Sequence, residues 1–255
     1  MLPNPIFLNI HMYGVMIAIG ILSCYLCLWF FCKKKNIEEN FTDFLSYNGF
    51  ASILVGFLFA GLFQAFYNYL KNPELGFHFN GITFLGGLIG GIACFLTIYF
   101  IFRKKFNNKL IDCVSFIPLC IVIAHAFGRV GCFFAGCCYG VKTDSWLGVK
   151  FPDLDYKVLP TNLMEAIFLF ILFGIMFYLI WKKDFKYNLP LYFISYGLWR
   201  FFIEFFRGDD RGAFIFNLSP SQFWSIIMII CGITLIFYMK MLYAKRIEET
   251  NILTK

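Results

Sequence analysis

Two arginines lie inside apolar stretches of this chain, where a positive charge is energetically costly. Arg129 lies in the run HAFGRVGCFFAGCCYG at 125–140, and Arg200 lies in YGLWRFFIEFFRGD at 196–209. A charge at hydrocarbon depth costs roughly 3 kcal/mol, so such residues usually face the interior of a helix bundle and mark a functional site. Guanidinium groups bind phosphate through paired hydrogen bonds and keep their charge when partly desolvated. We therefore expect Arg129 and Arg200, together with Arg207, to bind an anionic group, which in a membrane is most readily a phospholipid phosphate.

Neighbouring side chains qualify this expectation. Glu204 follows Arg200 by four residues, so on a helix the two share a face, and an ion pair that merely neutralises both is the simpler interpretation. His125 precedes Arg129 by one helical turn, which places both on one face if the helix extends that far. His125 is then either a hydrogen-bonded structural residue or a general base with a pKa near neutrality.

Ten cysteines are present, and they fall into two groups. Seven lie in apolar stretches, where a thiol behaves as a small hydrophobic group. The other three, Cys132, Cys137 and Cys138, lie where disulfides can persist if this segment faces an oxidising envelope. The paired C-x-x-C spacing of structural zinc sites is missing, so we expect structural thiols or a disulfide and no metal. Metal binding and a catalytic thiol remain as alternatives.

The rest of the chain must position these groups within a membrane. Of 255 residues, 60% are hydrophobic and only 15% are charged, whereas soluble domains are nearer half apolar and a quarter charged. Apolar runs recur without a polar module between them, which predicts one all-α, polytopic membrane domain over 1–255 with an outer-face loop segment at 128–160. We expect seven transmembrane helices, at 12–32, 44–67, 82–102, 110–127, 161–181, 189–206 and 222–242.

Basic residues orient these predicted spans, because they accumulate in short cytoplasmic loops. Most of the lysines and arginines follow odd-numbered spans, as in Lys33 to Lys35, Arg103 to Lys105 and Lys182 to Lys186. This pattern predicts an N-terminus outside and a C-terminus in the cytoplasm. The net charge of +7 is then mostly a matter of topology, and we expect no nucleic-acid partner. The start of the chain has no basic residue ahead of its apolar stretch, so we expect the first span to be retained.

Small and aromatic residues suggest further contacts. Gly86 and Gly87 begin a series of glycines at helical spacing in the third span, which favours close helix packing or leaves room for a lipid headgroup. Tyr13 and Tyr196 are aromatic residues that either pack at their membrane level or direct a hydroxyl at a headgroup.

At these residues the chain resembles the prolipoprotein diacylglyceryl transferases of the bacterial inner membrane. Five segments carry the likeness in the right order, namely Met12-Tyr13-Gly14, GITFLGGLIG at 81–90, GRVGCFFAGCCYG at 128–140, PTNLME at 160–165 and YGLWRFFIEFFRGD at 196–209. The resemblance covers nearly the whole chain. Where the family usually has a histidine before Gly-Gly this chain has Leu85, and the signature's asparagine and glutamate are replaced by Cys132 and Cys137.

This resemblance implies a multi-pass protein of the bacterial inner membrane that moves a diacylglyceryl group from phosphatidylglycerol to the lipobox cysteine of a prolipoprotein. Its implied partners are phosphatidylglycerol, membrane lipid and prolipoprotein signal peptides, and no cofactor is needed. An acceptor other than a prolipoprotein, or a non-enzymatic protein that binds metal or senses redox state through its Cys/His cluster, is the alternative.

The resemblance and the residues together assign roles. We expect Arg129 and Arg200 to hold the phosphodiester, His125 to replace the missing histidine as base, and Tyr196 to donate a hydrogen bond. Supporting or substrate-binding roles are expected for the remaining candidates, which are Tyr13, Gly86, Gly87, Gly128, Gly131, Asn162, Glu165, Glu204 and Arg207.

Overall fold

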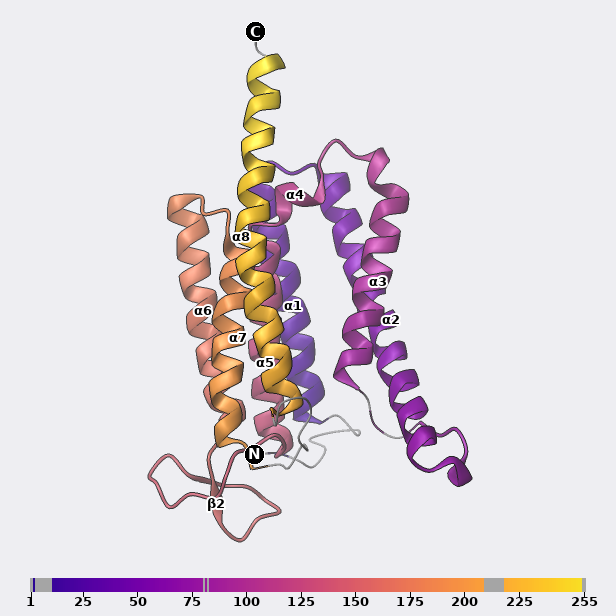
Figure 1. Ribbon diagram of the computed structural model, residues 1–255, viewed down its shortest axis with the longest axis vertical. Helices are drawn as coiled ribbons and strands as arrows, with labels where there is room; N and C mark the ends of the chain where they lie inside the picture. Colours follow the sequence, from indigo (N-terminus) through magenta and orange to yellow (C-terminus); the bar gives the residue numbers. More distant parts are fainter. Residues whose placement is uncertain (1, 3–10, 80, 82, 209–217, 254–255) are drawn as a thin grey trace. The chain divides into compact units, whose positions relative to one another are not determined.

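The computed structural model describes residues 2, 11–79, 81, 83–208 and 218–253, and this part of the chain is mostly helical (Figure 1). Six of its helices are long and apolar enough to cross a membrane, which confirms the predicted all-α, multi-span class. They are α1 (Met12–Lys34), α2 (Glu39–Lys71), α3 (Phe84–Phe102), α5 (Ile117–Ala135), α6 (Thr161–Lys183) and α8 (Pro220–Leu253). A further helix, α7 (Asn188–Ile203), has 16 residues and continues as a 3-10 turn, η3 (Glu204–Phe206).

The fourth predicted span is wrong at both ends. A short helix, α4 (Leu110–Cys113), is followed by a break, and α5 begins only at Ile117 with Pro118 in its first turn. Proline suits this position because the first amides of a helix have no partner within the helix. The helix then continues to Ala135 rather than ending at 127, so the first residues of the predicted outer loop, 128–135, are helical.

Gly136 ends α5. Its backbone has a left-handed φ of 74°, and its N–H group is donated to the carbonyl oxygens of Cys132 and Phe133. Glycine is the usual residue at such a helix end because it adopts this conformation without a steric penalty. The termination therefore places Arg129 and Cys132 on the last turns of a regular helix.

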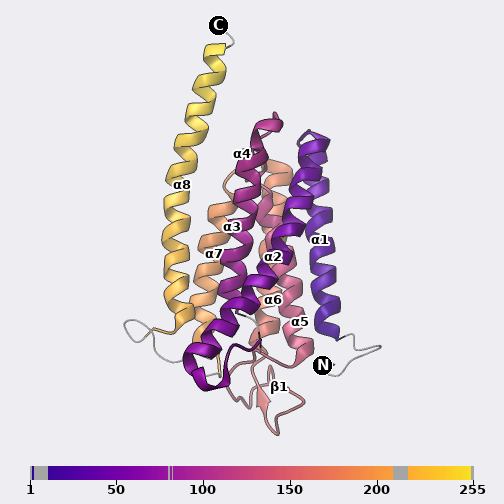
Figure 2. The ribbon, with the colours of Figure 1, turned by 90° about the vertical axis from the view of Figure 1, so that its right-hand side faces the viewer.

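The chain forms two compact units, residues 1–27 with 113–255, and residues 28–112. In the first unit α7 lies against α8 and α6, and α5 lies against α6 and α7 (Figure 2). Gly20 of α1 comes close to Ala124 and Phe127 of α5, which joins the start of α1 to this unit. The core between these helices is apolar and contains Leu119, Val122, Ala126, Leu169 and Met176.

Residues 136–160 follow α5 at one end of the first unit and contain a small antiparallel pair, β1 (Val149–Lys150) and β2 (Lys157–Val158) (Figure 1). Gly140 joins this segment to the end of η3 through a bridge with Arg207. The Val141 N–H group donates to the Phe206 carbonyl oxygen at 2.9 Å, and Gly140 N–H donates to Leu159 at 2.7 Å.

The close approach at Gly140 predicts a cost for any side chain there. A methyl group on Gly140 would clash with the Phe206 carbonyl oxygen and lie 2.7 Å from Thr161 Cγ2. We expect Gly140→Ala to lower the free energy of unfolding by about 1–3 kcal/mol, as overpacking does. Gly174→Ala is the matched control, because a methyl group there meets nothing within 4 Å. Thermal unfolding in detergent compares them, and an equal effect of both changes would contradict this account.

In the second unit α2 packs against α3 through the glycines of the third predicted span. A methyl group on Gly86 would lie 2.6 Å from Phe63 Cβ, and one on Gly87 would lie 3.2 Å from the Gly56 carbonyl oxygen. Small residues allow helices to approach closely in membranes. Close packing therefore accounts for Gly86 and Gly87, and their role in substrate binding stays a prediction. The single domain over 1–255 also stays a prediction.

Candidate active site

The carboxylate of Glu165 is the centre of a buried polar cluster. Glu165 lies in the second turn of α6 and is only 1% exposed. Its Oε1 atom lies 3.0 Å from Arg129 Nε and 3.8 Å from His125 Nε2, and it accepts a hydrogen bond of 2.7 Å from the Tyr196 hydroxyl. Helices α5 and α7 thus direct polar side chains at one oxygen atom of a residue on α6.

Helix geometry explains why these side chains meet. His125 and Arg129 are one turn apart on α5, and both reach Glu165, which confirms that they share a face. A buried carboxylate is tolerated only when opposite charge and hydrogen bonds compensate for its lost hydration. Arg129 provides the charge and is itself about one-fifth exposed, at 20% of its side chain. Glu165, predicted as a support, therefore organises the site.

Tyr192 also belongs to the site, and the sequence reasoning missed it. Its hydroxyl lies 3.4 Å from His125 Nδ1, and the ring of Tyr196 stands edge-on to the His125 ring at a centroid distance of 4.9 Å. Tyr192 and Tyr196 are one turn apart on α7, and this spacing was the available signal. Two tyrosines and Glu165 therefore fix the position of the imidazole ring.

Arg200 is held in a second set of contacts at the end of α7. Its Nη2 atom lies 2.8 Å from Glu204 Oε2 and donates a hydrogen bond of 2.8 Å to Ser221 Oγ. The predicted ion pair with Glu204 is thus confirmed. Ser219 completes the set by donating its hydroxyl to Glu204 Oε1 at 2.9 Å. No sequence signal indicated Ser219 or Ser221, because they precede or begin another helix, α8.

One donor of Arg200 stays unused in this network. Its Nη1 atom is buried and has no hydrogen-bond partner among the residues that the structure describes. Glu165 interacts electrostatically with both Arg129 and Arg200, so the two guanidinium groups belong to one charged cluster. A buried donor without a partner is costly and is often explained by a ligand. In the described part of the chain, Arg200 Nη1 is therefore a donor without a partner, although both guanidinium groups are paired with a carboxylate.

Tyr13 and the glycines of the signature lie on the contact between α1 and α5. A methyl group on Gly131 would lie 3.1 Å from the Tyr13 ring, and one on Gly128 would lie 3.9 Å from Ile17. Tyr13 is 39% exposed. Gly131 thus lets the tyrosine approach α5, whereas the substrate-binding roles of these three residues stay predictions.

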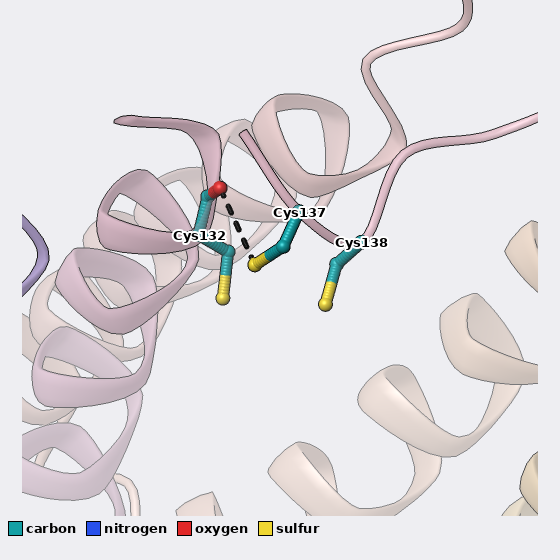
Figure 3. Close-up of side chains that lie close together, drawn as sticks. All are labelled: Cys132, Cys137 and Cys138. Carbon is teal, nitrogen blue, oxygen red and sulfur yellow. Dashed lines mark hydrogen bonds between the residues drawn. The ribbon is translucent and has the colours of Figure 1, made fainter. Parts of the chain in front are cut away.

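Arg207 and three cysteines lie next to the charged cluster of Arg129, Glu165 and Arg200. Arg207 is buried and donates a hydrogen bond of 3.3 Å from Nη1 to the Cys138 carbonyl oxygen. The Sγ atoms of Cys132, Cys137 and Cys138 all lie within 4.8 Å of one another, and all three are free thiols (Figure 3). Hydrogen bonds from the other two thiols, and the positive charge of Arg207, lower the pKa of the Cys138 thiol.

The hydrogen bond between Tyr196 and Glu165 predicts a measurable loss of stability when it is removed. A hydrogen bond to a charged group is worth about 1.5–3 kcal/mol, so Tyr196→Phe should lower the free energy of unfolding by that amount. Tyr192→Phe removes a longer hydrogen bond to an imidazole from the same helix face and should cost less than about 1 kcal/mol. Chemical or thermal unfolding of the two variants in detergent tests this. Equal losses of unfolding free energy in the two variants would show that the hydrogen bond to Glu165 is not the source of the effect of Tyr196→Phe.

Comparison with known proteins identifies the family. The family model described as prolipoprotein diacylglyceryl transferase matches residues 4–238. A phosphatidylglycerol–prolipoprotein diacylglyceryl transferase of Clostridium tetani (strain Massachusetts / E88) is 35% identical over 239 residues, which cover 89% of this chain and 92% of the relative. The Campylobacter curvus (strain 525.92) protein of the same name is 31% identical over 255 residues, covering 93% and 92%. Arg129 and the buried Glu165 and Tyr196 lie in the segments that carried the resemblance, and the chain belongs to the prolipoprotein diacylglyceryl transferase family.

Proposed function

We propose that this protein transfers the diacylglyceryl group of phosphatidylglycerol to the lipobox cysteine thiol of prolipoproteins. The relatives above are named for this reaction. The observation that carries the proposal is the polar set of Arg129, Glu165, Tyr196 and Arg200, in which the buried Nη1 atom of Arg200 has no hydrogen-bond partner among the described residues. A phosphate group is the ligand that such a pair of guanidinium groups suits best.

The reaction forms one bond and breaks one. The thiol sulfur bonds to the glyceryl carbon as a thioether, the bond between that carbon and the phosphate oxygen breaks, and glycerol phosphate leaves with the electron pair. Negative charge grows on the departing phosphate during this step. Arg129 and the buried Nη1 donor of Arg200 stabilise that charge, and such an effect is strongest where the donors are shielded from water. Glu204 and Ser221 hold the Arg200 side chain in position.

The thiol must also lose its proton. A free cysteine has a pKa near 8.5 and is mostly protonated at neutral pH, so a base beside it increases the rate. His125 is the base that we assign, because Tyr192 lies beside its Nδ1 atom and Glu165 lies 3.8 Å from Nε2. The Glu165 carboxylate stabilises the imidazolium that forms when His125 takes the proton.

The topology that we propose has seven spans, an outside N-terminus and a cytoplasmic C-terminus in the bacterial inner membrane. Helix α7 and η3 together cover 188–206, and this length is close to the roughly 20 residues that a span needs. Lysines occupy the last turns of α1 and α6 at Lys33, Lys34, Lys182 and Lys183, as cytoplasmic ends do. Arg129 and Arg200 lie near the C-terminal ends of α5 and α7. In this arrangement, those helix ends face the envelope. Prolipoprotein signal peptides would reach the site from the membrane.

Purified protein tests the proposed function directly. Incubated with phosphatidylglycerol and a peptide that contains a lipobox, it should increase the peptide mass by one diacylglyceryl group and release glycerol phosphate. The matched control peptide carries serine in place of the lipobox cysteine and should stay unmodified. Release of glycerol phosphate without modification of the cysteine peptide would indicate a different acceptor, and no release at all would contradict a transferase.

A further inference from the structure

Three thiols at the end of α5 form a cluster that the transfer mechanism does not use. Cys132 lies on the last helical turns, and Cys137 and Cys138 lie in the turn that follows Gly136. Their Sγ atoms are all within 4.8 Å of one another, and the three side chains lie close together (Figure 3). Cys137 is exposed and the other two are half-buried, so an ion can reach the cluster from solvent.

The backbone helps to set this arrangement. Gly136 and Cys138 both have left-handed φ angles, of 74° and 62°. For a residue with a side chain this conformation costs roughly 1–2 kcal/mol, so the surrounding structure must hold it. The Cys137 N–H group donates to the Cys132 carbonyl oxygen at 3.1 Å. Asn162 and Thr161 donate side-chain hydrogen bonds to the carbonyl oxygens of Cys137 and Cys138, at 2.7 and 3.1 Å.

The separation of the sulfur atoms suits a soft metal ion. A zinc–sulfur bond is about 2.3 Å long, which at tetrahedral angles places sulfur atoms about 3.8 Å apart. The observed limit of 4.8 Å therefore requires a contraction of at most about 1 Å. The missing C-x-x-C spacing had argued against a metal in the sequence, but the left-handed turn at Cys138 places the thiols of Cys137 and Cys138 next to Cys132.

We propose that Cys132, Cys137 and Cys138 form a three-thiolate site for a thiophilic d10 metal ion, Zn²⁺ or Cu⁺. Thiolates are the ligands that these ions prefer in proteins. On binding, each thiol releases its proton to solvent and forms one metal–sulfur bond, the ion loses water ligands, and no oxidation state changes. The guanidinium of Arg207 lies beside Cys138 and offsets negative charge on the complex. The ion would fix the helix end that carries Arg129, three residues before Cys132.

Metal titration of the full-length protein tests this site. Protein in detergent is reduced, stripped with a chelator, and titrated with Zn²⁺ and, without oxygen, with Cu⁺, each in competition with a chromophoric chelator. We expect one ion per chain and a higher thermal unfolding midpoint with metal. The titration that gives the tighter binding identifies the preferred ion. Each of Cys132→Ser, Cys137→Ser and Cys138→Ser should weaken binding by at least about tenfold, the lower limit for loss of an outer-shell partner.

Control variants separate a lost ligand from a damaged fold. Cys94→Ser and Cys231→Ser remove half-buried thiols from α3 and α8 and should bind metal as the unchanged protein does. Cys138→Gly removes a ligand while it relieves the left-handed strain, so it should lose affinity without a lower unfolding midpoint in the absence of metal. Equal binding by the unchanged protein and the triple serine variant would overturn the proposal. So would failure of the reduced protein to bind either ion.

Discussion

Replacement of Arg129 by alanine should reduce the rate of diacylglyceryl transfer by about 10²–10³-fold, the effect of losing a group that stabilises charge in the transition state. The change removes a guanidinium from the cluster and leaves the Glu165 carboxylate, 1% exposed, without its nearest cation. Arg129→Lys keeps the charge but loses the planar fork, so we expect it to recover only part of the activity. Initial rates with the lipobox peptide, at several phosphatidylglycerol concentrations, separate kcat from KM.

Arg103→Ala is the control for this experiment. Arg103 is an exposed cation in the short 3-10 helix η2 (Arg103–Lys105), and its removal deletes one positive charge without touching the Glu165 cluster. We expect its rate to match that of the unchanged protein. A well-folded Arg129→Ala variant with a rate within a factor of about two of the control would remove Arg129 from the mechanism.

The length of the apolar runs predicted the helical, multi-span class, and the misplaced fourth span has a physical cause. The stretch from Leu110 to Ile123 is mostly apolar, and its two polar residues, Asp112 and Ser115, are too few to divide a predicted span at the break between α4 and α5. Local backbone geometry makes that break. Phe116 and Pro118 start a new helix, and Gly136, not the end of the apolar run, stops it. The existence of a membrane span, which depends on hydrophobicity, is therefore more predictable than the ends of its helix, which single residues determine.

The site was predictable where its charges share one helix and less so where several helices meet. Arg200 with Glu204, and His125 with Arg129, follow from helical spacing. Glu165 was expected only in a supporting role, because the sequence alone does not show which charges lie beside it. Its importance arises only when α5, α6 and α7 bring Arg129, His125 and Tyr196 to one oxygen atom.

The largest stability effect that we expect comes from breaking the pair of Arg129 and Glu165. Glu165→Leu leaves the guanidinium of Arg129 without its carboxylate, and loss of one partner of a buried ion pair typically costs about 3–5 kcal/mol. Replacement of both partners by apolar residues of similar size is often neutral in other proteins. We therefore expect the double variant Arg129→Met with Glu165→Leu to regain most of the free energy of unfolding.

Activity should not follow stability in this series, and the difference separates the two roles of the pair. If Arg129 binds the phosphate, the double variant is stable but transfers no faster than Arg129→Ala, because no apolar residue replaces the guanidinium at the substrate. If the pair served only the fold, the double variant would regain transfer together with its unfolding free energy. Unfolding free energies and transfer rates from the same preparations of both single variants and the double variant decide between these outcomes. A double variant as unstable as Glu165→Leu alone would show that burial of an unpaired charge is not the source of the loss.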